Sequence, residues 1–429
     1  MGEEKLSIVI VGAGIAGLSA SIACALGGHY VTVLEGAKEL AEIGAGFQIT
    51  PNASKILFRW GLEPKMKETW AVPSSCTVHR YSGKVLAHEE KFAENNMRKY
   101  QAPFVDMHRM DMQKILFDKA VEVGVKVKLN TRVASVRQSE HNTPEIVCKD
   151  GSIITGDLVV GADGLWSRCR ESLLGTNDQP LPTGDLAYRI VLTLDQIKDE
   201  ELRHFVSQPT LHFWIGPKAH VVGYSMKSGT LYNAVLLVPD DLGEGVSRTA
   251  GSTEEMKKLF EGWDPLLTRL LSCVETVDKW KLMHRAELPS WANSQKNFVL
   301  IGDSCHPMLP YLAQGANSSI EDGAVLGKAL SYVKTRSQVP QAVDLFERLR
   351  KSRGEKVARE TFHQRHDFHL EDGPEQIERD KLFESQLGKS EPEVKFPSRW
   401  NCPEIQPWLY GYDADAEVEQ AIKAHPIAV

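Results

Sequence analysis

The stretch Leu6-Ser-Ile-Val-Ile-Val-Gly12-Ala-Gly14-Ile-Ala-Gly17 decides the fold of this 429-residue chain. The continuous aliphatic run before the glycines is typical of a parallel strand that is buried on both faces. Residues 18–26 carry apolar side chains at helical spacing, and residues 30–34 form a second apolar strand. The stretch therefore predicts a βαβ unit at the start of an α/β fold.

Each glycine of this stretch has its own expected role. Gly12 permits the tight turn, Gly14 lets the backbone approach a pyrophosphate, and Gly17 lets the helix pack closely on the sheet. The N–H groups and the positive dipole end of the helix would then meet the phosphates. Glu35 ends the second strand, and it is either a solvated carboxylate or an acceptor for two ribose hydroxyls. In the second interpretation it repels a 2′-phosphate, so the site is expected to hold FAD or NAD rather than NADP.

Composition narrows the class of protein. The chain has 42% hydrophobic and 25% charged residues, typical of a globular protein with a large core. Its 50 Lys+Arg against 57 Asp+Glu give a net charge of -7, which disfavours nucleic acid and anionic membranes as partners. The 7 cysteines never occur as CxxC, so we expect reduced thiols, no metal site and a cytoplasmic protein. There is no apolar run long enough for a spanning helix and no cleavable signal at the N-terminus.

The domain organisation follows from where the pattern changes. Residues 183–289 alternate apolar and polar side chains between Gly and Pro breaks, which predicts an antiparallel sheet. Residues 298–301 are again fully apolar, so the chain is expected to return to the first domain. The prediction is a discontinuous Rossmann-like cofactor domain at 1–182 and 290–335, with the antiparallel sheet as substrate domain. Residues 336–429 should form a C-terminal helix, beginning near Pro340, and a polar, Pro-rich tail.

Three further motifs lie at wide intervals along the chain. They read Gly44-Ala-Gly46-Phe-Gln-Ile-Thr-Pro51-Asn52, Gly161-Ala-Asp163-Gly164-Leu-Trp-Ser167-Arg-Cys-Arg170, and Gly302-Asp303-Ser-Cys-His306-Pro307-Met-Leu-Pro310-Tyr-Leu-Ala-Gln314-Gly315-Ala316-Asn317. With these motifs the chain resembles the single-component FAD-dependent aromatic monooxygenases, which have the para-hydroxybenzoate hydroxylase-like fold. Within that family it is most similar to the fungal salicylate hydroxylase-like group. The resemblance extends from Leu6 to residues 408–413.

The resemblance implies a flavin site that the residue chemistry supports. Asp303 follows a buried strand, where its carboxylate can accept hydrogen bonds from the ribityl hydroxyls. Gly315 and Ala316 begin a helix whose N–H groups and dipole can stabilise the anionic pyrimidine side of a reduced flavin.

The family also assigns cofactor contacts to Ala45, Gly46, Arg109 and the Asp163-Gly164 pair. In the family, Arg109 contacts FAD, and Asp163-Gly164 lies in a motif implicated in binding both FAD and NAD(P)H. Position alone leaves simpler interpretations open, namely a surface arginine for Arg109 and a turn for Asp163-Gly164.

Two residues of the predicted antiparallel sheet, Arg189 and Tyr224, are candidates for substrate contact and catalysis. Arg189 precedes an apolar run, and a buried guanidinium requires an anionic or polar partner. By the resemblance, the two side chains hold a substrate phenolate, and a cation lowers the pKa of a phenol. The structural alternatives are a salt bridge for Arg189 and a packed sheet aromatic for Tyr224. Further pocket candidates in this region are Tyr188, His212, Trp214 and His220.

His306 and Cys305 lie inside the expected flavin loop. His306 has the right pKa for a catalytic base, but its place next to Pro307 favours a role in orienting the cofactor. Cys305 is expected to be a small buried residue rather than a nucleophile, because no triad accompanies it.

The expected function is hydroxylation of a small aromatic substrate in secondary metabolism. By the resemblance, NAD(P)H reduces noncovalent FAD, O2 adds to give a flavin hydroperoxide, and its terminal oxygen is transferred to the ring. Phenolic, salicylate-like and indole-type substrates stay open, as do decarboxylation, NADH against NADPH, and monomer against homodimer. The alternatives are a FAD-dependent dehydrogenase or oxidase and a non-catalytic FAD-holding protein.

Overall fold

A computed structural model of the chain describes residues 4–40, 45–389 and 398–428.

A parallel sheet forms one part of the molecule. The five parallel strands lie in the order β18-β11-β1-β2-β7. Their bounds are β1 Ser7–Val11, β2 Tyr30–Leu34, β7 Lys126–Lys128, β11 Leu158–Gly161 and β18 Phe298–Leu300. Helix α1 (Ile15–Leu26) connects β1 to β2, which confirms the predicted βαβ unit.

Helix α10 (Gly315–Leu330) packs very closely against α1. A Cβ atom added at Gly323 would lie 2.6 Å from the Ala20 nitrogen, and one added at Gly327 would overlap Ala23. Glycine at these positions therefore lets the two helix backbones approach each other. Helix α5 (Arg109–Glu122) packs on α1 as well.

A second, eight-stranded sheet has the order β16-β17-β12-β15-β14-β13-β4-β5. All neighbours are antiparallel except β13 and β4, which are parallel. Its strands are β4 Ser75–Arg80, β5 Val85–Glu89, β12 Leu181–Thr193, β13 Thr210–Gly216, β14 Ala219–Met226, β15 Leu231–Pro239, β16 Arg248–Gly251 and β17 Val277–His284. That β4 and β5 extend this sheet was not predicted from the sequence, because a strand does not encode a distant partner in its own periodicity.

One face of the large sheet packs on short helices, and the other faces the parallel sheet's domain. The covering helices are α7 (Glu200–Ser207), α8 (Thr253–Leu259) and α9 (Pro265–Ser272), which share a hydrophobic cluster with residues of that face such as Tyr188 and Trp214. The remaining small sheets are β3 (Gly46–Ile49) paired with β6 (Val105–His108), and β8 (Val133–Gln138), β9 (Pro144–Cys148) and β10 (Ile153–Thr155). The other short helices before the C-terminal region are α2 Pro51–Arg59, α3 Glu63–Lys67, α4 Phe92–Tyr100 and α6 Arg168–Leu174. The 3-10 turns are η1 Leu194–Gln196, η2 Lys227–Gly229, η3 Gly302–Ser304, η4 Pro310–Leu312 and η5 Arg336–Gln338.

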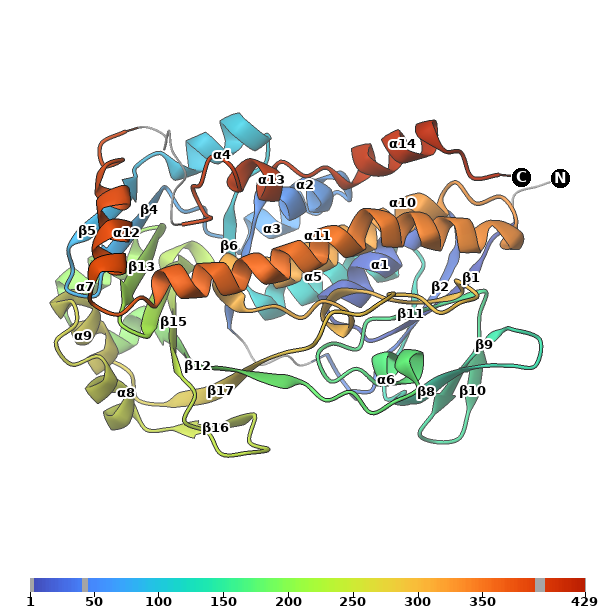
Figure 1. The fold of residues 1–429 in the computed structure, drawn as a ribbon, viewed down its shortest axis with the longest axis horizontal. Helices are drawn as coiled ribbons and strands as arrows, with labels where there is room; N and C mark the ends of the chain where they lie inside the picture. Colours follow the sequence, from blue (N-terminus) through green and yellow to red (C-terminus); the bar gives the residue numbers. More distant parts are fainter. Residues whose placement is uncertain (1–3, 41–44, 390–397, 429) are drawn as a thin grey trace.

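The C-terminal region begins with α11 (Val339–Phe368), the helix predicted from Pro340 onward. Figure 1 shows α11 running along the length of the molecule, from the end that holds β1 and β2 to the large sheet. The tail contains more helix than its polar composition suggested, with α12 (Pro374–Glu384), α13 (Gln406–Tyr410) and α14 (Ala414–Ala424). Aromatic anchors fix it, since the Trp400 ring lies 5.7 Å from Phe104 and 5.3 Å from Phe213.

The α/β fold is confirmed, with its Rossmann-like sheet, large antiparallel sheet and C-terminal helical segment. Across the described ranges, no helix is long and apolar enough to cross a membrane.

Candidate active site

One cavity brings together residues from most of the predicted motifs. It lies between the N-termini of α1 and α10 and the inner face of the large sheet, and its empty volume is about 1350 Å³ including the part open to solvent. Nine of the residues predicted to hold cofactor or substrate line it: Gly14, Ala45, Gly46, Arg109, Arg189, Tyr224, Asp303, Gly315 and Ala316. Gly44, which belonged to one of the motifs, lies outside the described residues.

Gly12, Gly17 and Glu35 do not line the cavity but shape the loop that does. Gly12 has a φ of +105°, and a Cβ atom at Gly17 would overlap the Gly12 carbonyl oxygen, so both positions require glycine. The half-buried Glu35 carboxylate accepts hydrogen bonds from the Ala13 and Ala37 N–H groups, at 2.9 and 2.8 Å. The acidic residue therefore also fixes the turn between β1 and α1.

Gly14 is different because it borders open space. A Cβ atom built there meets nothing within 4 Å, so packing within the protein does not demand glycine. The space is the one that a pyrophosphate needs beside the first turn of α1.

The opposite wall consists of η3 and the start of α10. Asp303 is exposed within η3, and Gly315, Ala316 and Ser319 of α10 line the cavity. Gly302 has a φ of +62°, and a Cβ atom there would lie 2.8 Å from the Ala16 Cβ. Because of this close approach, the N-termini of two helices face one cavity and favour negative charge in it.

These features fit FAD. Gly14 and the α1 N-terminus can take the pyrophosphate, Glu35 the ribose, and Asp303 the ribityl hydroxyls. The start of α10 can hold the pyrimidine side of the ring.

A buried ionic network connects α10 to the helices packed against it. Glu321 accepts two hydrogen bonds from Arg353, both 2.9 Å, and pairs with Arg350 at 2.6 Å. Asp322 accepts from Arg350 at 2.8 Å. Asn52, at the start of α2, donates to Glu321 at 2.6 Å. The network joins α2, α10 and α11, and it holds α10 in place without touching the cavity.

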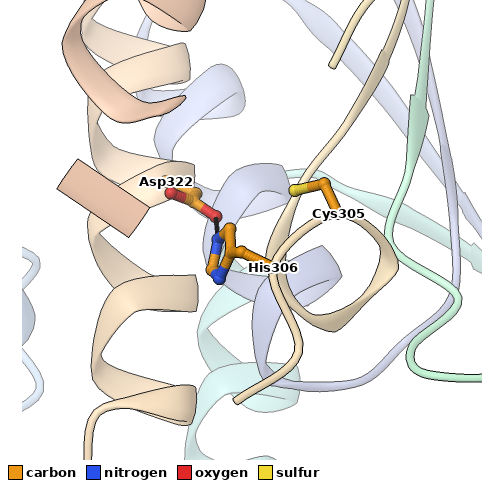
Figure 2. A group of neighbouring side chains, drawn as sticks. All are labelled: Cys305, His306 and Asp322. Carbon is orange, nitrogen blue, oxygen red and sulfur yellow. Dashed lines mark hydrogen bonds and ion pairs between the residues drawn. The ribbon is translucent and has the colours of Figure 1, made fainter. Parts of the chain in front are cut away.

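His306 connects this network to the loop that carries Asp303. Figure 2 shows its ring turned toward Asp322, with a Nε2 to Oδ2 distance of 2.6 Å. Burial alone would lower the pKa of His306, but the Asp322 carboxylate raises it above its ordinary value. The other acceptor positions of Asp322 serve Arg350 and the Gly302 N–H group. His306 and Asp322 therefore help to fix the loop that carries Asp303, whereas the role in orienting the cofactor, which the sequence favoured, stays a prediction.

Cys305 is close to the same pair (Figure 2), and the three side chains have ligand atoms within 4.8 Å of one another. The Cys305 thiol donates to the Gly302 carbonyl at 3.4 Å. Burial raises its pKa well above the usual value, so the thiol is neutral. A neutral thiol and a carboxylate already engaged with His306 and Arg350 are poor metal ligands.

Arg189 and Tyr224 face the cavity from β12 and β14, two strands of the large sheet that are separated by β15. The Arg189 guanidinium lies 4.6 Å from the centre of the Trp280 ring. The expectation of an arginine buried in apolar surroundings was wrong, because Arg189 is half-buried and also borders a surface pocket. Tyr224 is only 3% exposed. Burial raises the pKa of its hydroxyl well above the usual value, so it stays a neutral donor.

The other pocket candidates do not line the cavity. Tyr188 and Trp214 belong to the cluster on the opposite face of the sheet, and His212 stacks on Trp214 with ring centres 5.6 Å apart. His220 projects toward α11 and pairs with His369 at 2.7 Å. Strand alternation could have separated Tyr188 from Arg189, but not the inner from the outer face.

Asp163 lies beside the cavity and caps a helix. Its carboxylate accepts from the Arg168 and Cys169 N–H groups, at 2.8 and 3.0 Å, at the start of α6. Gly164 does line the cavity. The contacts of Asp163 fit the turn interpretation, whereas the position of Gly164 agrees with the expected cofactor contact, which stays a prediction.

The apolar walls of the cavity and one polar wall residue were not predicted from the sequence. The walls include Ala187, Val222, Val235, Leu237 and Leu309, and Gln48 adds a carboxamide. Val222 lies two residues from Tyr224 on β14, so the period of a strand was an available signal.

Comparisons with known proteins agree with this site. A family model described as an FAD binding domain matches residues 5–361. The FAD-dependent monooxygenase OpS4 of Beauveria bassiana is 46% identical over 98% of both chains. The 3-hydroxybenzoate 6-hydroxylase 1 of Aquipseudomonas alcaligenes is 34% identical over 75% of this chain and 79% of its own. The crystal structure of CtdE in complex with FAD and a substrate has a TM-score of 0.83 at 23% identity, over 98% of both chains, and supports the fold alone.

The family model covers residues 5–361, and this range includes every residue that is a candidate for contact with the cofactor. The chain therefore belongs to the FAD-binding-domain family of FAD-dependent monooxygenases and hydroxylases.

Proposed function

We propose that the enzyme hydroxylates the ring of a small phenolic substrate, using FAD, O2 and NAD(P)H, as part of secondary metabolism. The observation that carries this proposal is the single cavity that places Arg189 and Tyr224 among apolar walls, next to the residues that fit FAD. One oxygen atom of O2 enters the product and the other leaves as water, and NAD(P)H supplies the two electrons. The hydroxybenzoate-hydroxylating relative supports an aromatic substrate.

The apolar walls select the ring. Ala187, Val222, Val235 and Leu237 come from three adjacent strands and present aliphatic surface to the cavity. A flat aromatic ring buried there gains the free energy of removing apolar surface from water, about 25 cal/mol per Å². The same walls keep bulk water from the reacting atoms.

Arg189 and Tyr224 act on the phenol oxygen. A guanidinium stabilises the phenolate form and so makes the ring carbons more electron-rich. Tyr224 is neutral because burial raises its pKa, so it can donate a hydrogen bond to that oxygen. When bound, FAD would pass the two electrons of NAD(P)H to O2 and so activate the oxygen atom that enters the product. The protein's own residues orient the ring and hold its negative charge.

Two parts of the site hold the cofactor, namely the turn before α1, which is fixed by Glu35, and the N-terminus of α10. We assign Gly14, Glu35 and Asp303 to the phosphates, ribose and ribityl chain, and Ala45, Gly46, Gly315 and Ala316 to the ring. Arg109 begins α5 and lines the same cavity, which suits a contact with the anionic parts of FAD.

The test is substrate-dependent oxygen insertion. The purified protein should be yellow with noncovalent FAD, and a panel of phenols, hydroxybenzoates and indoles should be assayed with NADH and NADPH under ¹⁸O2. The proposal expects a phenol to accelerate NAD(P)H oxidation and to appear with one ¹⁸O atom. Oxidised product without ¹⁸O would indicate a dehydrogenase or oxidase. A colourless protein that takes up no FAD would contradict the cofactor assignment.

A further inference from the structure

Asn233 is a polar residue in an otherwise apolar strand. It lies in β15 between Tyr232 and Ala234 and is 0% exposed. Its Oδ1 accepts a hydrogen bond from the Gly46 N–H group at 2.9 Å. Its Nδ2 has no hydrogen-bond partner among the described residues. An unsatisfied buried donor costs about 1–3 kcal/mol, so the residue requires an explanation beyond packing.

The orientation of this carboxamide follows from its one hydrogen bond. Turning it over would set the NH2 group against the Gly46 N–H, leaving two donors facing each other. Gly46 therefore fixes the oxygen toward β3 and leaves the NH2 group as the unpaired end.

The position of Asn233 on the sheet connects it with the substrate side. Across the sheet Asn233 pairs with Tyr224 on β14 and with Val191 on β12. Residues directly opposite on neighbouring antiparallel strands project from the same face, with Cβ atoms about 4.5–5.5 Å apart. The side chain that holds Gly46 is thus the immediate neighbour of the candidate substrate contact Tyr224.

Strand β3 rests directly on this part of the sheet. A Cβ atom added at Gly46 would lie 2.6 Å from the Met226 Sδ and 2.8 Å from the Asn233 Cγ. Ala45, Gly46 and Phe47 line the cavity, whereas Asn233 does not. One short strand therefore separates Asn233 from the space assigned to the flavin.

We propose that Asn233 is a positioning residue that holds the Gly46 backbone and thereby sets the flavin ring against the sheet face that carries Tyr224. This inference rests on the proposed placement of the flavin beside Ala45 and Gly46. Asn233 does not line the cavity itself and acts through Gly46. An apolar side chain of equal size would avoid the unpaired NH2 group but would leave the Gly46 N–H without its acceptor.

The experiment compares three variants of the full-length enzyme. Asn233→Leu removes the acceptor at nearly constant volume, and Asn233→Asp keeps an acceptor facing Gly46. Met226→Leu is the matched control, because Met226 packs against the same glycine without a hydrogen bond. The readouts are the FAD dissociation constant by fluorescence titration, the visible absorption band of bound FAD, and the melting temperature of the apoprotein.

We expect Asn233→Leu to weaken FAD binding about tenfold, the scale of one net hydrogen bond, and to shift the flavin band. The apoprotein melting temperature should stay close to that of the parent. Asn233→Asp should restore most of the affinity, and Met226→Leu should match the parent. Parent-like affinity and spectrum in Asn233→Leu would overturn the proposal, and so would an equal effect of Met226→Leu. If Asn233→Leu does not fold, Asn233→Ala removes the same acceptor and is judged by the same two outcomes.

Gly46→Ala separates this inference from the flavin placement beneath it. The added methyl group must push β3 away from Met226 and Asn233. A flavin band unchanged in Gly46→Ala would show that the ring does not lie beside β3, and both proposals would fall. A band that changes in Gly46→Ala but not in Asn233→Leu would overturn the role of Asn233 alone.

Discussion

The proposed FAD site has two ends that are built in different ways: a nucleotide end at the turn between β1 and α1, and a ring end beside the large sheet and the start of α10. At the nucleotide end, a single segment supplies the turn, and Glu35 fixes it by bonding to the Ala13 and Ala37 N–H groups. At the ring end, six separate elements (β3, β12, β14, β15, η3 and α10) each contribute one to three residues. The first end depends on backbone space, and the second depends on side chains held by the tertiary structure. Substitutions should therefore fail in different ways at the two ends.

The largest effect is expected from Gly14→Val. The branched side chain would fill the space assigned to the pyrophosphate, so FAD affinity should fall by more than about 100-fold. The apoprotein should melt at the parent temperature, because a Cβ atom at Gly14 meets nothing within 4 Å. FAD titration and thermal unfolding of the apoprotein check both parts.

Gly17→Ala is the matched contrast to Gly14→Val. Its Cβ atom would overlap the Gly12 carbonyl oxygen, so the apoprotein itself should lose stability. Full FAD occupancy in Gly14→Val would show that this loop is a structural turn only.

At the ring end, Arg189→Ala should lower substrate turnover by about 10²-fold, the scale for one preorganised electrostatic group. FAD content should not change, and the NAD(P)H still consumed should yield peroxide instead of product. Arg189→Lys should recover little, since an ammonium cannot reproduce the planar fork. The measurement is the ratio of product formed to NAD(P)H consumed.

Arg248→Ala is the control for this prediction. Arg248 lies 4.3 Å from the centre of the same Trp280 ring but does not line the cavity, so its removal should leave coupling unchanged. If the Arg189 variants lose thermal stability and flavin while coupling stays normal, Arg189 has a structural role.

A smaller loss is expected from Glu35→Ala at the nucleotide end. The carboxylate would lose its hydrogen bonds to the ribose, each about 1.5–3 kcal/mol when charge-assisted, so FAD should bind roughly 10- to 100-fold more weakly. Glu35→Gln keeps acceptor capacity and should lose less. Equal FAD affinity in the parent and both variants, measured by fluorescence titration, would limit Glu35 to fixing the turn between β1 and α1.

The smallest effect concerns the pH dependence of the free energy of unfolding that arises from the buried pair of His306 and Asp322. The folded pKa of His306 is raised above its ordinary 6.5, since Asp322 outweighs the effect of burial. The stabilisation from this charge is therefore complete below pH 6.5 and is lost as pH rises through the folded pKa. Urea unfolding of the parent and His306→Asn from about pH 6 to 9 should show their difference shrinking with pH. A difference that grows with pH would contradict a protonated His306.

Local motifs were predictable because their physics is local. A left-handed turn at Gly12, a helix that starts at once and a strand ending just before Glu35 depend on residues that are close in sequence. The same holds for η3 and the α10 start, whose residues lie within one short stretch. Helix α11 was predicted as well, because its apolar positions repeat at helical spacing.

The partnership of distant segments could not be predicted in this way. Nothing in residues 75–89 indicates that they extend a sheet formed mainly by residues 181–284. The aromatic anchors that fix the tail, Trp400 and Tyr410, have partners much earlier in the chain, Phe104 and Phe213. Propensity and periodicity are properties of a segment, whereas these contacts depend on how segments pack.

By itself, the sequence determined a dinucleotide site and the parallel βαβ core, because steric demands on glycine and the burial of aliphatic runs act within single segments. The tertiary structure decided that Arg189 stacks on Trp280 instead of being enclosed, and that Asp163 caps α6. It also decided which of Tyr188, His212 and Tyr224 face the cavity, since a strand's alternation separates two faces but only packing makes one of them the inside.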